Sequence, residues 1–364
     1  MKKKYILFTI ISILLINLIT IILNNFSKKY IMQDGIMLAL TLDGEKITEY
    51  PEGTNYYVEI NCENGKGRWL VDEWKLAVES ITGKVICNID FISSPISLRS
   101  KVENKATIQT NGYRYSGTNP DNYIWFNNEM WRIIGSIPTC LSANCGTNTT
   151  NLVKIIRKES IGGLAYDLTT SNYTGVWGNN TLYTLLNNYY YGSLNGIETE
   201  YCSSYHLTAG ADCDYTTIGI NSNSYYGKMI KNVYWNTGAS SSSVTAGTAY
   251  TNEIATRNIL GYIGLMSASD YGYAADNSHY NTTMDNYYSN AITSTNWLYG
   301  QGYEYTNIKS SSDTNYTLNI NYSGGLDKYY VPKGLAVRPV VYLDPSVYIV
   351  SGDGTEGNPY QIGM

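Results

Sequence analysis

The sequence of 364 residues contains little histidine, little phenylalanine and few charged residues. There are two histidines and four phenylalanines, and 15% of residues are charged. His206 and His279 alone give a zinc site or a Ser-His-Asp triad few ways to form. Motifs of zinc proteases, α/β-hydrolases and nucleotide-binding enzymes are absent from the sequence. The common catalytic classes therefore have no signal here, and no metal or cofactor is predicted.

Positive charge is scarce beyond residue 30. Five of the 25 basic residues precede it, so the remaining chain has 20 basic against 30 acidic residues, a net charge of −10. Nucleic acid and anionic lipid surfaces both require basic patches. We therefore expect no nucleic-acid partner.

One long hydrophobic run stands near the N-terminus, from Ile6 to Leu23. Its length in a helix matches the hydrocarbon core of a bilayer, about 30 Å. Three lysines precede it, and basic residues stay on the cytoplasmic side. We predict a cytoplasmic tip and transmembrane helix in residues 1–30, and hence a single-pass cell-membrane protein with an extracellular C-terminal part. A cleaved signal peptide is the alternative, although no alanine for a cleavage site occurs before Ala39.

Six cysteines follow that segment and no Cys-x-x-Cys occurs. An even number in an exported chain indicates disulfides rather than a metal site. We predict pairing between cysteines adjacent in sequence: Cys62–Cys87, Cys140–Cys145 and Cys202–Cys213.

Tyrosine is abundant, with 37 copies. Tyrosine packs an apolar ring and keeps a polar tip, which suits an extracellular domain with an adaptable polar surface. The alternative interpretation of this excess is codon bias, since an AT-rich genome raises the tyrosine content.

Hydrophobic patterning divides the remaining chain. Alternation in residues 56–62 and 84–91 predicts paired strands in a small β-rich module, 31–93. Residues 94–120 have no sustained period and are interpreted as a linker. Residues 121–364 begin with a hairpin at Asn127-Asn128, followed by a strand at 152–158. Asn180 caps a predicted helix, and residues 195–260 are expected to be largely loop.

Strands at both ends of residues 121–364, enclosing a helix and long loops, predict an α+β fold. An ordered set of motifs carries a resemblance. Its members are Trp131 to Ile134, Lys154 to Lys158, Trp177, Leu182 to Asn187, Ile263 to Tyr271, Trp297-Leu298 and Val337 to Leu343.

This set resembles a domain-of-unknown-function family in exported proteins of low-GC Gram-positive bacteria. That family is distantly similar to C-type-lectin-like folds, including the sulfatase-modifying-factor group. The resemblance implies a twisted antiparallel sheet with a flanking helix and long loops. The paired cysteines of formylglycine-generating enzymes are not recognisable here, which argues against their oxidase chemistry.

Candidate ligand-binding residues are aromatic or isolated charges. Trp177, Trp235 and Trp297 are predicted in loops, where they could stack on sugar rings or anchor the loop. Asp270 and Tyr271 lie in a tyrosine-rich turn. Arg338 stands alone in an apolar strand, so a salt bridge or a bound ligand should neutralise it.

Loop oxygens could hold calcium, although a plain turn is the simpler interpretation. Asp353, Glu356 and Asn358 have the spacing of such ligands. We expect a membrane-tethered extracellular binding or adhesion module that recognises a glycan or a surface protein through aromatic, polar loops. The alternatives are an extracellular hydrolase that uses carboxylates and a structural envelope protein.

Overall fold

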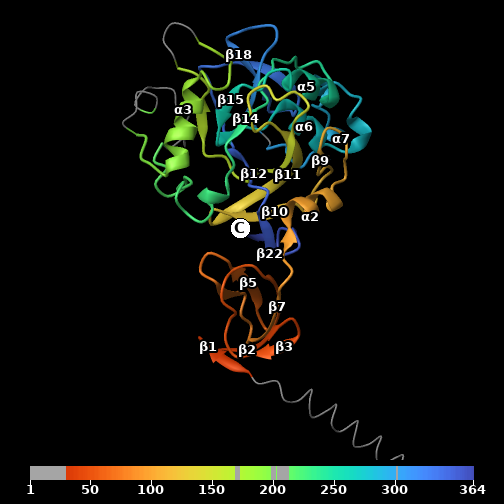
Figure 1. The fold of residues 1–364 in the computed structure, drawn as a ribbon. Helices are drawn as coiled ribbons and strands as arrows, with labels where there is room; N and C mark the ends of the chain where they lie inside the picture. The colour runs from red at the N-terminus through yellow and green to blue at the C-terminus, as the bar shows by residue number, and fades with distance from the viewer. Residues whose placement is uncertain (1–29, 169–172, 198–201, 203–212, 301) are drawn as a thin grey trace, which may run out of the picture. The chain divides into compact units, whose positions relative to one another are not determined.

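The computed structural model describes residues 30–168, 173–197, 202, 213–300 and 302–364. The chain divides into two compact units, of which the first ends at Ser94 and the second begins at Pro95 (Figure 1). Each unit has its own sheets and is described separately below.

The first unit is built on a five-stranded sheet in the order β1-β2-β7-β4, with β3 on β2. The strands are β1 (Ile31–Gln33), β2 (Ile36–Leu42), β3 (Glu45–Ile47), β4 (Tyr57–Glu63) and β7 (Ile86–Ile92). A hairpin of β5 (Lys66–Leu70) and β6 (Lys75–Glu79) completes the unit. Asp43 and Gly44 both have positive φ, which permits the tight β2–β3 turn.

Aromatic rings and a disulfide hold the core of the first unit. Trp69 and Phe91 are fully buried, with ring centroids 5.2 Å apart. Cys62 lies directly opposite Cys87 in the antiparallel β4–β7 ladder, and the two form a disulfide. The alternation in sequence therefore predicted both the paired strands and this cross-link.

The central sheet of the second unit has the order β10-β11-β12-β21-β16, with β9 on β11. Its strands are β9 (Tyr113–Arg114), β10 (Tyr123–Phe126), β11 (Glu129–Thr139), β12 (Thr150–Arg157), β16 (Ile263–Gly264) and β21 (Val340–Tyr342). Asn127 and Asn128 have φ of 53° and 60° and join β10 to β11, as the hairpin prediction requires.

Three further sheets belong to the second unit. One has the order β13-β20-β17-β18-β19, formed by β13 (Gly163–Ala165), β17 (Glu304–Lys309), β18 (Tyr316–Ile320), β19 (Leu326–Tyr330) and β20 (Gly334–Ala336). The smaller sheets are formed by β14 (Val233–Trp235) with β15 (Ile259–Gly261), and by β22 (Tyr348–Ser351) with β8 (Ile96–Ser97) and β23 (Gln361–Gly363).

The helices of the second unit are short. They are α2 (Leu98–Lys105), α3 (Thr181–Asn188), α5 (Ala246–Glu253), α6 (Ala268–Ala274) and α7 (Asn290–Thr293), with 3₁₀ turns η1 (Tyr190–Gly192), η2 (Gly227–Met229), η3 (Asn277–His279) and η4 (Met284–Asn286). Helix α2 packs on β11 and β12, and α5 packs on α6. The Asn180 side chain accepts from the Tyr183 backbone N–H, which confirms the predicted cap of α3.

The structure corrects the predicted fold class. Strands hold 37% of the described residues and helices 15%, so the protein is mostly β rather than α+β with a transmembrane helix. The prediction of a single-pass cell-membrane protein is corrected as well. Within the described ranges, no helix is both long enough and apolar enough to cross a bilayer, and the segment Ile6 to Leu23 lies outside those ranges.

Two segments expected to be irregular contain regular structure. Residues 94–120, interpreted as a linker, contain β8, α2 and β9, and from Pro95 onward they belong to the second unit. Residues 195–260, expected to be mainly loop, supply β14, β15 and α5. These elements were not predicted because the hydrophobic patterning of both segments is weak: many of their buried side chains are small or polar.

All three predicted disulfides are present: Cys62–Cys87, Cys140–Cys145 and Cys202–Cys213. Three disulfides are consistent with a secreted or extracellular protein, since reducing compartments do not preserve them.

Candidate functional site

The three tryptophans considered for sugar stacking or for anchoring a loop are core residues. Trp177, Trp235 and Trp297 are 0%, 1% and 8% exposed. The indole N–H of Trp235 donates to the Gly261 carbonyl, and that of Trp297 donates to the Tyr115 carbonyl, each at 2.9 Å. Buried rings held in this way have no open face, so the structure does not support a stacking role for them.

Arg338 is paired inside the protein. Its guanidinium donates to both carboxylate oxygens of Glu304, at 2.6 and 2.7 Å, and to the Leu298 carbonyl at 2.7 Å. Both side chains are buried. The expectation that this isolated charge would be neutralised is met by a salt bridge with Glu304, a partner that sequence reasoning did not identify.

Asp270 and Tyr271 are also enclosed. The Tyr271 hydroxyl donates to the Gly324 carbonyl at 2.6 Å. Asp270 stands in the first turn of α6, where its carboxylate accepts from the Ser267 backbone N–H and completes a capping box. The two neighbours therefore hold the start of α6 in place, and neither presents its side chain to solvent.

Asp270 is the centre of a buried charge cluster. Its Oδ1 accepts from Arg114 Nη1 and its Oδ2 from Lys154 Nζ, both at 2.5 Å. Arg114 on β9 and Lys154 on β12 both pair with Gly135 of β11, one on each side. Directly opposed residues share a face of the sheet, and Gly135 adds no side chain between the two cations. The sheet register therefore places two cationic side chains where both can pair with the carboxylate of Asp270.

The charge cluster shifts the pKa of its members. Burial acts to raise the pKa of Asp270, yet the charges of Lys154 and Arg114 hold it well below its ordinary value. Glu253, at the end of α5, accepts from the backbone N–H and hydroxyl of Ser269 at 2.8 and 2.5 Å. Burial raises the pKa of Glu253 to about 7, and the Asp270 charge adds to this effect.

These buried acids do not support the hydrolase alternative. A glycosidase needs two carboxyl groups that a substrate can reach. Glu253, Asp270 and Glu304 are 0%, 2% and 4% exposed, so none of them faces a substrate in this structure.

Partly exposed tyrosines gather instead around the β18–β19 hairpin. Tyr303 lies 5.6 Å from Tyr322 and 5.5 Å from Tyr329, between ring centroids. Tyr322 is 66% exposed, and Asp327 is an exposed neighbour on β19. We call Tyr303, Tyr322, Tyr329 and Asp327 the tyrosine surface. Partial burial raises the pKa of Tyr303, and the two other rings and Asp327 add to it.

A second trio of rings lies on the same hairpin. Tyr330 is 5.5 Å from Tyr173 and 5.6 Å from Tyr316, and the Lys328 ammonium is 5.4 Å from the Tyr316 ring. Because neighbouring strand residues point to opposite faces, Tyr329 and Tyr330 direct their rings to the two sides of β19. Rings therefore flank this strand on both faces.

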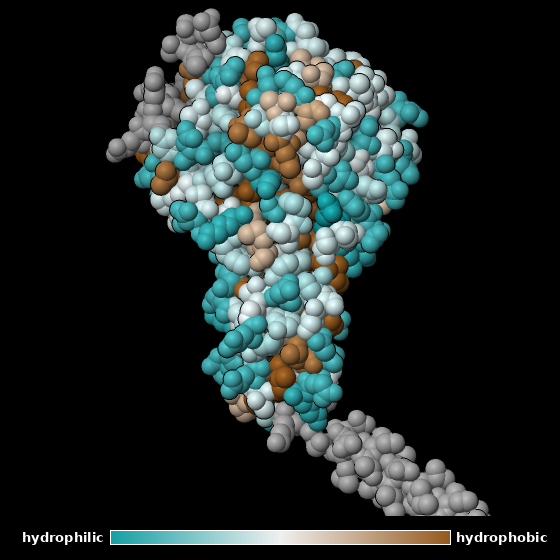
Figure 2. Space-filling view, in the orientation of Figure 1, coloured by the Kyte–Doolittle hydropathy of each residue, from teal (hydrophilic) through white to brown (hydrophobic). Residues whose placement is uncertain are grey.

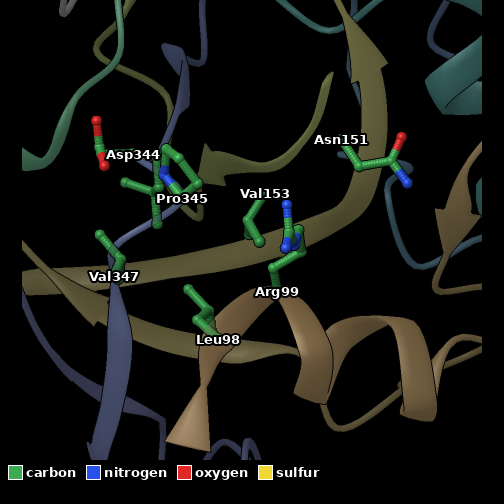
Figure 3. A pocket seen from close by; sticks show the side chains of 8 residues that line it. Leu98, Arg99, Asn151, Val153, Asp344, Pro345 and Val347 are labelled. Carbon is green, nitrogen blue, oxygen red and sulfur yellow. The ribbon is translucent and has the colours of Figure 1, made fainter. Parts of the chain in front are cut away.

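Hollows also occur elsewhere among the described residues. A cavity of about 330 Å³ lies on the first unit's sheet and is lined by Ala39, Leu40, Thr41, Lys46, Asn61, Asn88 and Asp90. In the second unit, Figure 3 shows Leu98, Val153 and Val347 around a gap that is too narrow for a water molecule. On the face drawn in Figure 2, hydrophobic residues reach the surface in limited patches among polar ones.

The candidate calcium ligands form a turn. Asp353 accepts from the backbone N–H and hydroxyl of Thr355, at 3.0 and 2.7 Å. Glu356 pairs with Lys158 at 2.7 Å. These contacts account for both carboxylates through protein groups.

Comparison with protein-family models, curated proteins and solved structures finds no match. The tyrosine surface was not identified from sequence, because 37 tyrosines give no contrast. The sequence feature that could have indicated this surface is the segment from Tyr322 to Tyr329, in which the two tyrosines flank glycine, serine and charged residues at a hairpin.

Proposed function

We propose that this protein is an exported carbohydrate-recognition protein and that the tyrosine surface binds the sugar. The observation that carries the proposal is the tilted pair of contacts of Tyr303 with Tyr322 and Tyr329, which leaves Tyr322 66% exposed. The three disulfides are consistent with work outside the cell.

The chemistry of the surface suits a sugar ring. An aromatic face packs against the apolar C–H face of a sugar, while the tyrosine hydroxyls stay hydrated. Asp327 is an exposed carboxylate and accepts hydrogen bonds from sugar hydroxyls. Neighbouring ring contacts restrict Tyr303 and Tyr329, so little side-chain entropy is lost on binding.

The size of the surface favours a sugar over a folded protein partner. A tyrosine presents at most about 150–250 Å², so three partly exposed rings offer a few hundred Å² at most. A stable protein interface buries about 800 Å² on each partner. A patch of this size matches one or two sugar residues.

The test is a glycan array with the full chain, followed by titration calorimetry on any oligosaccharide that binds. Changing Tyr322→Ala should weaken binding about tenfold, which corresponds to about 1.4 kcal/mol. Tyr30→Ala is the matched control, since Tyr30 is 37% exposed and belongs to the first unit. Failure of every glycan to bind, or an unchanged affinity in Tyr322→Ala, would contradict the proposal.

A further inference from the structure

We propose that Lys154 and Asp270 condense to an intramolecular amide bond that joins β12 covalently to α6. Lys154 Nζ lies 2.5 Å from Asp270 Oδ2, and the two residues are 116 positions apart in sequence. They are 3% and 2% exposed. This inference does not depend on the proposed sugar binding.

The contacts around Asp270 bring together the groups that the reaction needs. The Lys154 nitrogen attacks Cγ of Asp270, and the C–Oδ2 bond breaks. Arg114 Nη1 donates to Oδ1, the oxygen that carries negative charge in the tetrahedral intermediate and becomes the amide oxygen. Two of the three ammonium protons leave with Oδ2 as water, and the third stays on the amide nitrogen. Charge and atoms balance without an oxidant or other co-reactant.

Burial favours this product over the ion pair. Two ions held away from water each carry a desolvation cost of several kcal/mol, on the order of what their attraction returns. Condensation removes the charges of Lys154 and Asp270 and releases water. The Arg114 charge stays buried, and Arg114 keeps Oδ1, now the amide oxygen, as its hydrogen-bond acceptor. The rings of Trp235 and Tyr342 lie 5.5 and 5.4 Å from Lys154 Nζ, which keeps the amine in an aromatic, water-poor setting.

The closeness of the Lys154 amine and the Asp270 carboxyl group accelerates the condensation. Held reactants reach effective concentrations of about 10⁵–10⁸ M, compared with the dilute free groups. The sheet register fixes Lys154 and Arg114 on either side of Gly135, so the Asp270 carboxyl meets both in one orientation. The reactive form requires proton transfer from Lys154 to Asp270, which Arg114 opposes by stabilising the carboxylate. We therefore expect a slow reaction that follows folding.

The experiment is intact-mass spectrometry of the full chain after folding, incubation, and reduction of the disulfides under denaturing conditions. The wild-type protein should be lighter than its sequence mass by one water, and a protease digest should yield one branched peptide joining the Lys154 and Asp270 segments. Wild-type protein that keeps its full sequence mass after prolonged incubation would overturn the proposal, whatever the variants do.

Two variants make the assignment specific. Lys154→Arg keeps a cation beside Asp270 but removes the nucleophilic amine, so its mass should equal its sequence mass. Asp270→Asn should lose one ammonia in place of one water, because its amide nitrogen is the leaving group. A loss of water that persists in Lys154→Arg would place the reaction elsewhere and overturn the assignment.

Discussion

The salt bridge between Arg338 and Glu304 gives a quantitative prediction. Replacing Arg338→Met leaves Glu304 buried, ionised and without its cation. Breaking a buried pair from one side costs about 3–5 kcal/mol, and the Leu298 carbonyl also loses a donor, which adds about 1 kcal/mol. We expect the free energy of unfolding at about pH 8 to fall by about 4–6 kcal/mol in total.

The loss should depend on pH. Burial already raises the pKa of Glu304, and Arg338 opposes that shift. Without Arg338 the pKa rises further, so the folded state of the variant takes up a proton more readily than the unfolded state does. A group with a raised acid pKa favours folding at low pH, and this contribution is lost as pH rises. The penalty should therefore be smaller at about pH 5 than at about pH 8.

Urea denaturation followed by tryptophan fluorescence measures both quantities. The double variant Arg338→Met with Glu304→Leu is the control, because replacing both charges by apolar groups should recover most of the loss. A loss below about 1 kcal/mol in the single variant, or an equal loss at the two pH values, would refute a buried pair whose members depend on each other.

Three further predictions follow from the same structure. Glu253→Gln should flatten the dependence of Tm on pH between 4.5 and about 7. A carboxyl with a raised pKa favours folding below this range of pH, and that contribution is lost as the pH rises through it. An unchanged slope would exclude Glu253 as the titrating group. Removing the cross-link with Cys62→Ala and Cys87→Ala should lower the stability of the first unit by about 2–4 kcal/mol, measured by its urea midpoint. Asn180→Ala should cost about 1–2 kcal/mol, because α3 loses its cap and the Val176 carbonyl loses the Asn180 Nδ2–H donor; an unchanged urea midpoint would mean that neither contact stabilises the fold.

Local features were predictable from sequence. The Asn127-Asn128 turn, the cap at Asn180 and the strand positions of Cys62 and Cys87 each depend on a few neighbouring residues. Alternation places both cysteines on the inner face of paired strands, and this determines their pairing. Features of this kind need no knowledge of distant segments.

The candidate site was predictable only in part. Its isolation among apolar residues indicated that Arg338 needed neutralisation, but its partner Glu304 lies 34 positions away. The three tryptophans were predicted in loops, where both sugar stacking and loop anchoring were open to them, and the fold encloses all three. A polar neighbourhood in sequence does not report burial when short elements pack around a side chain.

The sequence by itself predicted the pairing of adjacent cysteines, the Asn127-Asn128 turn and the cap at Asn180, since these depend on residue type and short-range spacing. Only the tertiary structure decided that Asp270 joins Arg114 and Lys154, residues 156 and 116 positions away. It also decided that rings of the β18–β19 hairpin, rather than the tryptophans, reach the surface. The physical reason is that burial and charge pairing depend on which elements pack together across long separations, and local patterns do not record those contacts.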